Sequence, residues 1–277
     1  MKDINSLYYK ILKSTVGAVF NVRQSIAEII LGLPPINIQN KVNQIKHYLK
    51  IISNEVPEDP LLKTIQIITS SNSVPGEIHS LFRSVFKFLK WKVQINPEQF
   101  SQDDRVIIQQ SDSAKFHLLS PGCGLYTKDM MKKYTELLWS ASIENEFLND
   151  GQSVIPKPSC TPLCLNPETD RKTEVKLMSL FYENNLLNSF LYRRSVPGVS
   201  SPLCPCGSED QTAAHVLLRC PQLDPDVRAR ARDCLGDTEV NHVTLLNLSR
   251  NRTFISILYG VMYYQGDSLR DCISYIN

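Results

Sequence analysis

The most constraining feature of this chain is one short stretch, SPLCPCGSEDQTAAHVLLRCP, which carries four soft metal ligands. The ligands are Cys204, Cys206, His215 and Cys220. Three thiolates and one imidazole form a ligand set that is typical of structural zinc, which they enclose tetrahedrally. Four protein ligands leave no position for a reacting water, so such a site would stabilise the fold and would not catalyse.

The first two ligands are expected on a turn. Cys204 and Cys206 are two residues apart, so they cannot both lie on one face of a helix. Pro205 and Gly207, which adjoin them, are residues that favour turns. The sequence therefore predicts a turn that presents two thiolates.

The other two ligands are expected on a helix and at its end. His215 lies in a run of good helix formers. Cys220 comes five residues later, where helical side chains diverge, and Pro221 disfavours a helical conformation for the residue before it. We therefore expect Cys220 where the helix ends. Cys234 and His242 lie downstream and are alternatives that could replace one of the four ligands.

Composition indicates a globular intracellular protein. The chain has 277 residues, 42% of them hydrophobic and 21% charged, which is enough for two domains with buried cores. Its eight cysteines are too sparse for a disulfide scaffold. Lys10 and Lys13 interrupt the apolar N-terminal residues that a secretory signal needs, and no apolar run approaches the roughly 20 residues that span a bilayer. We expect a cytoplasmic or nuclear protein, without membrane contact, whose reduced thiols can bind zinc.

Apolar residues recur with helical periodicity along most of the chain. The expected helices cover residues 4–20, 25–33, 38–52, 79–91, 126–147, 173–192, 224–235 and 251–265. Residues 106–109 and 242–248 are the only candidates for strands. The sequence therefore predicts a mainly α fold.

A proline-rich stretch, PKPSCTPLCLNP at residues 156–167, marks the best domain boundary. We expect a bundle-like helical segment over residues 1–150, a proline-rich linker over 151–175 and a small helical domain stapled by zinc over 176–277.

Positive charge is concentrated in the first third of the chain. Residues 1–92 contain 12 Lys and Arg against 6 Asp and Glu, whereas the remainder contains 18 against 22. One expected helix carries Arg83, Lys87 and Lys90 on one face and ends near Trp91. Such a face is more often only solvated, but it also suits nucleic-acid phosphates, with Trp91 available to stack on a base.

A second basic group flanks the four metal ligands. Arg193 and Arg194 precede them, and Arg219 lies between His215 and Cys220. Together with Tyr192, these arginines complete the candidate nucleic-acid interface. The partner that they suggest is RNA or single-stranded DNA, bound weakly and without sequence preference.

Two motifs in the expected order resemble one family. The Cys-x-Cys-Gly, Gln-Thr, His-x-Leu-Leu and Cys-Pro steps resemble the C-terminal zinc knuckle of non-LTR retrotransposon reverse transcriptases. The string SFLYRR at residues 189–194 is similar to the Tyr-Leu-x-Arg-like string that precedes that knuckle. NVRQSIAEIILGLPPI at residues 21–36 resembles the segment just after the polymerase core. The two matches bracket about residues 4 to 235.

The resemblance implies a nucleic-acid-binding remnant of such a polyprotein, with a structural zinc and without catalysis of its own. A polymerase needs a Tyr/Phe-x-Asp-Asp pair of carboxylates to hold two metals. The string Phe100-Ser-Gln-Asp-Asp104 has one residue too many and lacks flanking apolar strands, so a polar loop or a helix start is expected there. The strands and spaced acidic residues of a ribonuclease H are also not found. The alternative is a protein-interaction scaffold in which zinc only stabilises a helical fold.

Overall fold

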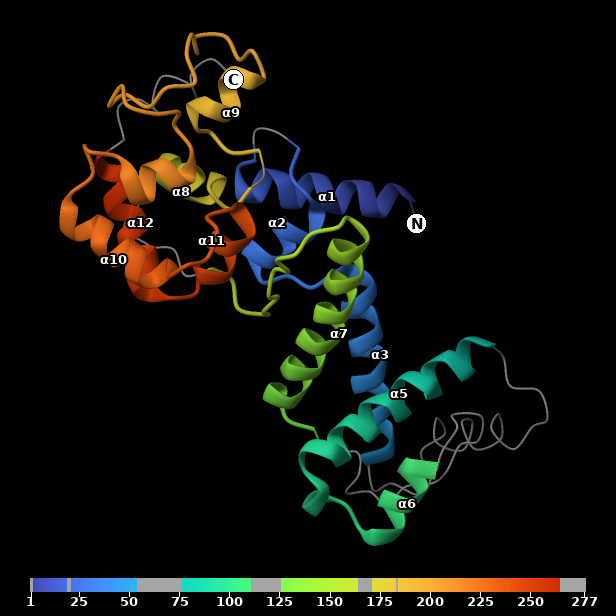
Figure 1. Cartoon of the computed structure of the whole chain (residues 1–277). Helices are drawn as coiled ribbons and strands as arrows, with labels where there is room; N and C mark the ends of the chain where they lie inside the picture. Colours follow the sequence, from blue (N-terminus) through green and yellow to red (C-terminus); the bar gives the residue numbers. More distant parts are fainter. Residues whose placement is uncertain are drawn as a thin grey trace. The chain divides into compact units, whose positions relative to one another are not determined.

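The computed structural model describes residues 2–18, 21–53, 76–110, 126–163, 171–182 and 184–264 (Figure 1). The prediction of a mainly helical chain is confirmed, and the described residues contain no strand beyond one isolated bridge. The α-helices are α1 (Lys2–Val16), α2 (Gln24–Leu31), α3 (Ile36–Ser53), α5 (Gly76–Ile95), α6 (Gln102–Gln110), α7 (Lys128–Asn149), α8 (Arg171–Ser179), α9 (Asn188–Arg193), α10 (Pro225–Leu235), α11 (His242–Leu248) and α12 (Arg252–Tyr264).

Both strand candidates were wrong. Residues 106–109 lie in α6, and residues 242–248 form α11. Each helix begins at a side-chain cap: the Ser101 hydroxyl accepts from the Asp104 N–H at 3.1 Å, and the Asn241 side chain accepts from the Thr244 N–H at 2.9 Å. These caps satisfy helix N–H groups, and short apolar runs carry too little periodicity to separate strand from helix.

The chain divides into two compact units that are not continuous in sequence. Unit 2 is Pro34–Trp139, and unit 1 combines Met1–Leu33 with Ser140–Asn277. This division differs from the linear one expected at residues 150 and 176, because the N-terminal helices join the C-terminal half of the chain. The Tyr182 hydroxyl, for example, donates to the Val16 carbonyl at 3.0 Å. Part of the expected linker, residues 164–170, lies outside the described residues.

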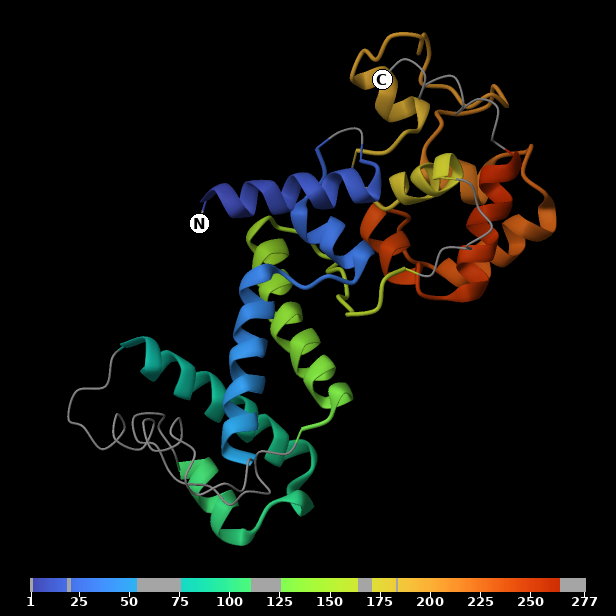
Figure 2. The same cartoon turned by 180° about the vertical axis from the view of Figure 1, so that it is seen from behind.

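Aromatic side chains form the core of unit 2. The rings of Tyr48 on α3 and Phe82 on α5 meet edge to face at 5.5 Å. Tyr134 on α7 contacts Phe88 and Trp91 on α5, with ring centroids 5.0 and 5.2 Å apart. Figures 1 and 2 both show α5 crossing α3 near the start of α7. These contacts hold α5 in place, whereas Arg83 and Lys87 on the same helix are exposed.

In unit 1, the end of α2 packs tightly against a later segment. Gly32 has a φ of 64° and ends α2, while the Leu33 N–H bonds to the Glu28 carbonyl at 3.0 Å. The Leu163 N–H donates to the Ile30 carbonyl at 3.0 Å, so residues 161–163 lie across the end of α2. A Cβ at Gly32 would lie 2.5 Å from the Pro162 nitrogen, which explains why glycine stands between the two leucines here.

Candidate metal centre and basic surfaces

A tight hairpin presents the first two sulfurs, as predicted. The Cys204 N–H donates to the Glu209 carbonyl at 2.8 Å, and the Gly207 N–H donates to the Cys204 carbonyl at 2.8 Å. The isolated bridge joins Leu203 to Asp210 across this hairpin. Gly207 has a φ of 78°, a conformation that glycine adopts without strain. The turn therefore places Cys204 and Cys206 close together at its tip.

A π turn presents the other two ligands, where the sequence predicted a regular helix. Residues His215–Arg219 are π-helical, and the Cys220 N–H donates to the His215 carbonyl at 2.8 Å. Cys220 itself is non-helical, so it does lie at the helix end as expected. Side chains five residues apart diverge on an α-helix, but a turn closed from i to i+5 brings them together. The Thr212 hydroxyl, which accepts from the His215 N–H at 3.1 Å, helps to start this turn.

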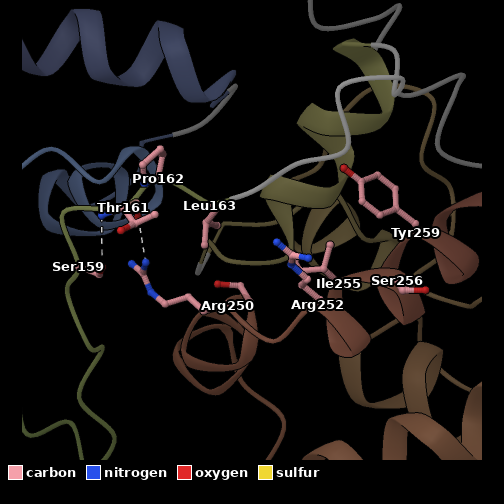
Figure 3. Close-up of a pocket in the computed structure, with 10 residues that line it drawn as sticks. Ser159, Thr161, Pro162, Leu163, Arg250, Arg252, Ile255, Ser256 and Tyr259 are labelled. Atoms are coloured by element: carbon pink, nitrogen blue, oxygen red, sulfur yellow. Dashed lines mark hydrogen bonds between the residues drawn. The ribbon is translucent and has the colours of Figure 1, made fainter.

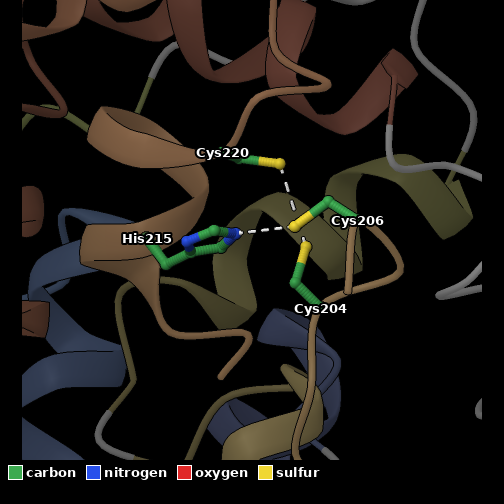
Figure 4. Close-up of side chains that lie close together, drawn as sticks. All are labelled: Cys204, Cys206, His215 and Cys220. Carbon is green, nitrogen blue, oxygen red and sulfur yellow. Dashed lines mark hydrogen bonds between the residues drawn. The ribbon is translucent and has the colours of Figure 1, made fainter. Parts of the chain in front are cut away.

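The four predicted ligands converge on one point (Figure 4). Their ligand atoms all lie within 4.8 Å of one another. The Sγ atoms of Cys204 and Cys220 are 3.8 Å apart, and the Cys206 Sγ lies 3.2 Å from the His215 Nε2. Zinc bonds of about 2.3 Å to sulfur and 2.0 Å to nitrogen give tetrahedral edges of about 3.8 and 3.6 Å. The group could therefore hold a metal ion, and its three cysteines are free of disulfide bonds.

Burial and hydrogen bonding act on the thiols in opposite directions. Burial raises the pKa of Cys204 to about 12, because a thiolate is poorly solvated there. Burial also opposes ionisation of Cys206, but hydrogen bonds from the Ser208 side chain and backbone outweigh it and lower the pKa to about 6. This shift favours the thiolate form of Cys206. Cys204 needs a neighbouring positive charge to become a thiolate, and a bound cation supplies that charge.

Glu209 and Arg219 lie behind the imidazole. The buried His215 Nδ1 lies 3.5 Å from a Glu209 carboxylate oxygen and has no hydrogen-bond partner among the described residues. The same carboxylate accepts from the Arg219 Nε at 2.9 Å, and this bond lowers the pKa of Glu209. A carboxylate behind a histidine orients the ring and leaves the other nitrogen for a metal. Arg219, predicted to contact nucleic acid, is thus already paired with Glu209.

Four contacts that the sequence analysis missed attach the ligands to the surrounding helices. Asn188, at the start of α9, donates to the Leu203 carbonyl at 3.0 Å, and its N–H donates to the Gln211 side chain at 2.9 Å. On α10, Arg228 donates to the Cys220 carbonyl at 3.0 Å and Arg232 to the Leu218 carbonyl at 2.8 Å. The i,i+4 spacing of the two arginines places them on one face, and this was the only signal that could have indicated their role.

Neither alternative ligand belongs to the group. Among the described residues, the candidate metal-binding set contains only the four predicted ligands, without Cys234 or His242. The Phe100–Asp104 string, where a polar loop or a helix start was expected, leads into the first turn of α6: Asp103 is exposed, whereas Asp104 is buried and accepts from the Ser101 hydroxyl at 2.6 Å. Asp104 therefore acts as part of the cap of α6.

The predicted basic face of α5 lies in unit 2. Arg83 and Lys87 are exposed and Lys90 is half-buried, one turn apart from each other along the helix. Trp91 is half-buried and packs against Phe88 and Tyr134, so its ring already has aromatic neighbours. This face is therefore a row of cations without an exposed aromatic ring at its end.

The second basic surface lies in unit 1, on the helix that contacts the Cys204 hairpin. Arg193 and Arg194 line a cavity of about 450 Å³ together with Asn184 and Phe190. The Arg194 guanidinium lies 5.4 Å from the centre of the Phe190 ring. Tyr192, between the two arginines, is 45% exposed. This surface offers both guanidinium groups and an accessible aromatic ring.

Comparison with known proteins gives no match: no protein-family model, no curated protein and no solved structure matches this chain. In the part of the chain that the structure describes, every helix is too short or too polar to cross a membrane. The function is therefore inferred from the chain's own geometry and chemistry.

Proposed function

We propose that this chain is a zinc-stapled, mainly helical nucleic-acid-binding protein that resembles the part of a non-LTR retrotransposon reverse transcriptase following its polymerase core. The observation that carries the proposal is the convergence of Cys204, Cys206, His215 and Cys220 within 4.8 Å, next to a helix that ends in two adjacent arginines.

Zinc is the metal that suits this ligand set. Three sulfurs and one imidazole nitrogen favour a soft tetrahedral ion, and four protein ligands fill its coordination shell. Cys204, His215 and Cys220 are buried, so the ion would lie beneath the surface with only the Cys206 side partly open. Its role is structural: it joins the hairpin to the π turn and neutralises the buried thiolates.

RNA or single-stranded DNA is the partner that the basic surfaces suit. The Arg193–Arg194 cavity has no acidic side chain among the described residues that line it, so its guanidinium groups can attract phosphates. Asn188 couples α9 to the Cys204 hairpin, so zinc binding would also stabilise this surface. With few phosphate contacts, we expect affinity of order micromolar at physiological salt and a log–log salt slope of about −2 to −4.

No catalysis is part of this proposal. Asp104 is engaged in capping α6, and neighbouring residues on a helix point in different directions. Primer extension or strand cleavage with magnesium that is lost in Asp103→Ala or Asp104→Ala protein would contradict this.

The test is a titration of labelled RNA at several salt concentrations. Arg193→Glu/Arg194→Glu protein and an Arg83/Lys87/Lys90 charge-reversed protein should bind at least several-fold more weakly than wild type, with flatter salt dependence. Arg230→Glu is the control, because Arg230 is an exposed residue of α10 with no polar partner among the described residues. Salt-insensitive binding, or unchanged affinity in both variants, would refute nucleic-acid binding at these surfaces.

One observation favours a second candidate, the protein-interaction scaffold. Leu7 and Ile11 lie one turn apart on α1 and are 60% and 56% exposed. An apolar pair of this kind suits a protein partner. Zinc-loaded protein that binds no RNA at low salt would support this candidate.

A further inference from the structure

A groove in unit 1, away from the four metal ligands, has the chemistry of a ligand site (Figure 3). Its volume is about 620 Å³, within the usual range for small-molecule pockets. One wall is the segment 159–163, and the other is the end of α11 with one face of α12. Figure 3 shows Arg252, Ile255, Ser256 and Tyr259 following one another along α12.

The two walls are fixed to each other and to the core. Arg250 donates to the Thr161 carbonyl at 2.8 Å, as the dashed line in Figure 3 shows. Residues 161–163 are also tied to α2 through the bond from Leu163 to Ile30. Asn251 caps α12 by accepting from the Thr253 N–H at 2.9 Å. The groove is therefore a formed feature of the fold.

The polar side chains that line the groove favour an anionic ligand. Arg252 is exposed at the start of α12 and, among the described residues, has neither an ion pair nor a hydrogen bond to another side chain. Ser256, one turn later, is also exposed and offers a hydroxyl. No acidic side chain appears among the described residues that line the groove. A guanidinium group in this setting favours a phosphate.

The rest of the groove is apolar and aromatic. Pro162, Leu163 and Ile255 contribute apolar surface, and Tyr259 contributes a ring at the far end. Arg252 and Tyr259 are seven residues apart on a helix, or about 10 Å along its axis. A ligand that matches both ends carries a phosphate and, one short linker away, a flat ring that packs on apolar surface.

We propose that this groove binds a nucleotide, with its phosphate on Arg252 and its base against Ile255 and Tyr259. The nucleotide is either free or one unit of a single strand. If the nucleotide is part of a single strand, the inference rests on the proposed function and adds the groove to the nucleic-acid-binding surface. If the nucleotide is free, the inference depends on the groove alone.

The experiment uses two photoreactive probes with the full chain: free 4-thiouridine 5′-monophosphate, and a short oligo(U) RNA that contains 4-thiouridine. After irradiation, mass spectrometry identifies the cross-linked peptides. We expect the α12 peptide that contains Tyr259 to be labelled. Arg252→Glu should weaken labelling there about tenfold, since it replaces a charge-assisted contact by repulsion. Ser256→Phe, which narrows the groove without changing its charge, should also weaken it, whereas Arg230→Glu should not.

The outcomes separate the two proposals. Labelling of α12 by the free nucleotide, without RNA binding, supports the groove and refutes the proposed function. RNA labelling confined to peptides outside the groove, with no α12 labelling by either probe, supports the proposed function and overturns the groove. If neither probe labels the chain, the groove proposal and the proposed function are both overturned. If α12 is labelled equally in wild type, Arg252→Glu and Ser256→Phe, the assignment of the groove as the binding site is overturned.

Discussion

Two glycines allow a controlled test of the packing in unit 1. Gly32 and Gly151 both end a helix with positive φ, 64° and 70°, and each is followed by a backbone bond that closes the helix end. A Cβ at Gly32 would lie 2.5 Å from the Pro162 nitrogen and 2.6 Å from the Thr161 carbonyl carbon, whereas a Cβ at Gly151 would meet nothing within 4 Å. The two sites therefore share the same conformational strain and differ in space.

The expected losses follow from these distances. Alanine at positive φ costs about 1–2 kcal/mol, which Gly151→Ala should show alone. Gly32→Ala adds overpacking against backbone atoms that cannot rotate away, about 1–3 kcal/mol more. At roughly 3 °C per kcal/mol, we expect the melting temperature to fall by about 3–6 °C for Gly151→Ala and by about 6–15 °C for Gly32→Ala.

The assay is thermal unfolding of both variants followed by circular dichroism, at fixed protein and zinc concentrations because bound metal shifts the midpoint. Urea unfolding of the same proteins gives the free energies independently. Equal losses in the two variants would show that residues 161–163 do not pack against the end of α2, and the groove wall that they form would then be misplaced.

Two further predictions concern single side chains. Asp224→Ala should destabilise the chain by about 1 kcal/mol in urea unfolding, because the Asp224 side chain caps α10 by accepting from the Asp226 N–H at 2.7 Å; Asp224→Asn should retain most of the stability. Burial raises the pKa of Glu28 from 4.5 to about 7, against the opposing hydrogen bond from Gln24. Between pH 4.5 and about pH 7 the folded chain therefore binds more protons at Glu28 than the unfolded chain does. The contribution of Glu28 to stability consequently falls as the pH rises through this range. Glu28→Gln should remove this pH-dependent loss of stability. The difference in free energy of unfolding between Glu28→Gln and wild type, measured by urea unfolding, should therefore be about 1–3 kcal/mol more favourable to the variant at pH 8 than at pH 5. A pH-independent difference between the two proteins would refute the buried position of Glu28.

The candidate metal-binding group was predictable from the sequence because its chemistry is local. Cysteine and histidine at ligand spacing, with Pro205 and Gly207 to form the turn, are sufficient to nominate the four residues. The π turn was not predictable, since His215 and Cys220 lie among ordinary helix formers and only the closing bond distinguishes the two helix types. The positions of the longer helices were also predictable from local sequence, because the periodicity of apolar residues indicates which face of a segment is buried.

Long-range pairing is what the sequence could not reveal. Periodicity shows that α1 and α2 bury a face but not that they pack with residues 140–277, so the units of the fold did not follow the linear order. The groove was missed for the same reason: the segment 159–163 and the residues around Arg252 are about 90 positions apart. Trp91 illustrates a further limit, because an aromatic residue beside a basic face looks available in sequence and is packed against Tyr134 in the fold.

The central claim is that Cys204, Cys206, His215 and Cys220 hold one zinc ion, and zinc K-edge X-ray absorption on purified chain, with elemental analysis of the same sample, tests it most directly. We predict about one zinc per chain, with three sulfurs at about 2.3 Å and one nitrogen at about 2.0 Å. Cys220→Ser should lose the zinc and Cys234→Ser should keep it. Metal-free protein with an unchanged melting curve, a shell of oxygen and nitrogen only, or zinc retained in full by Cys220→Ser would contradict the account.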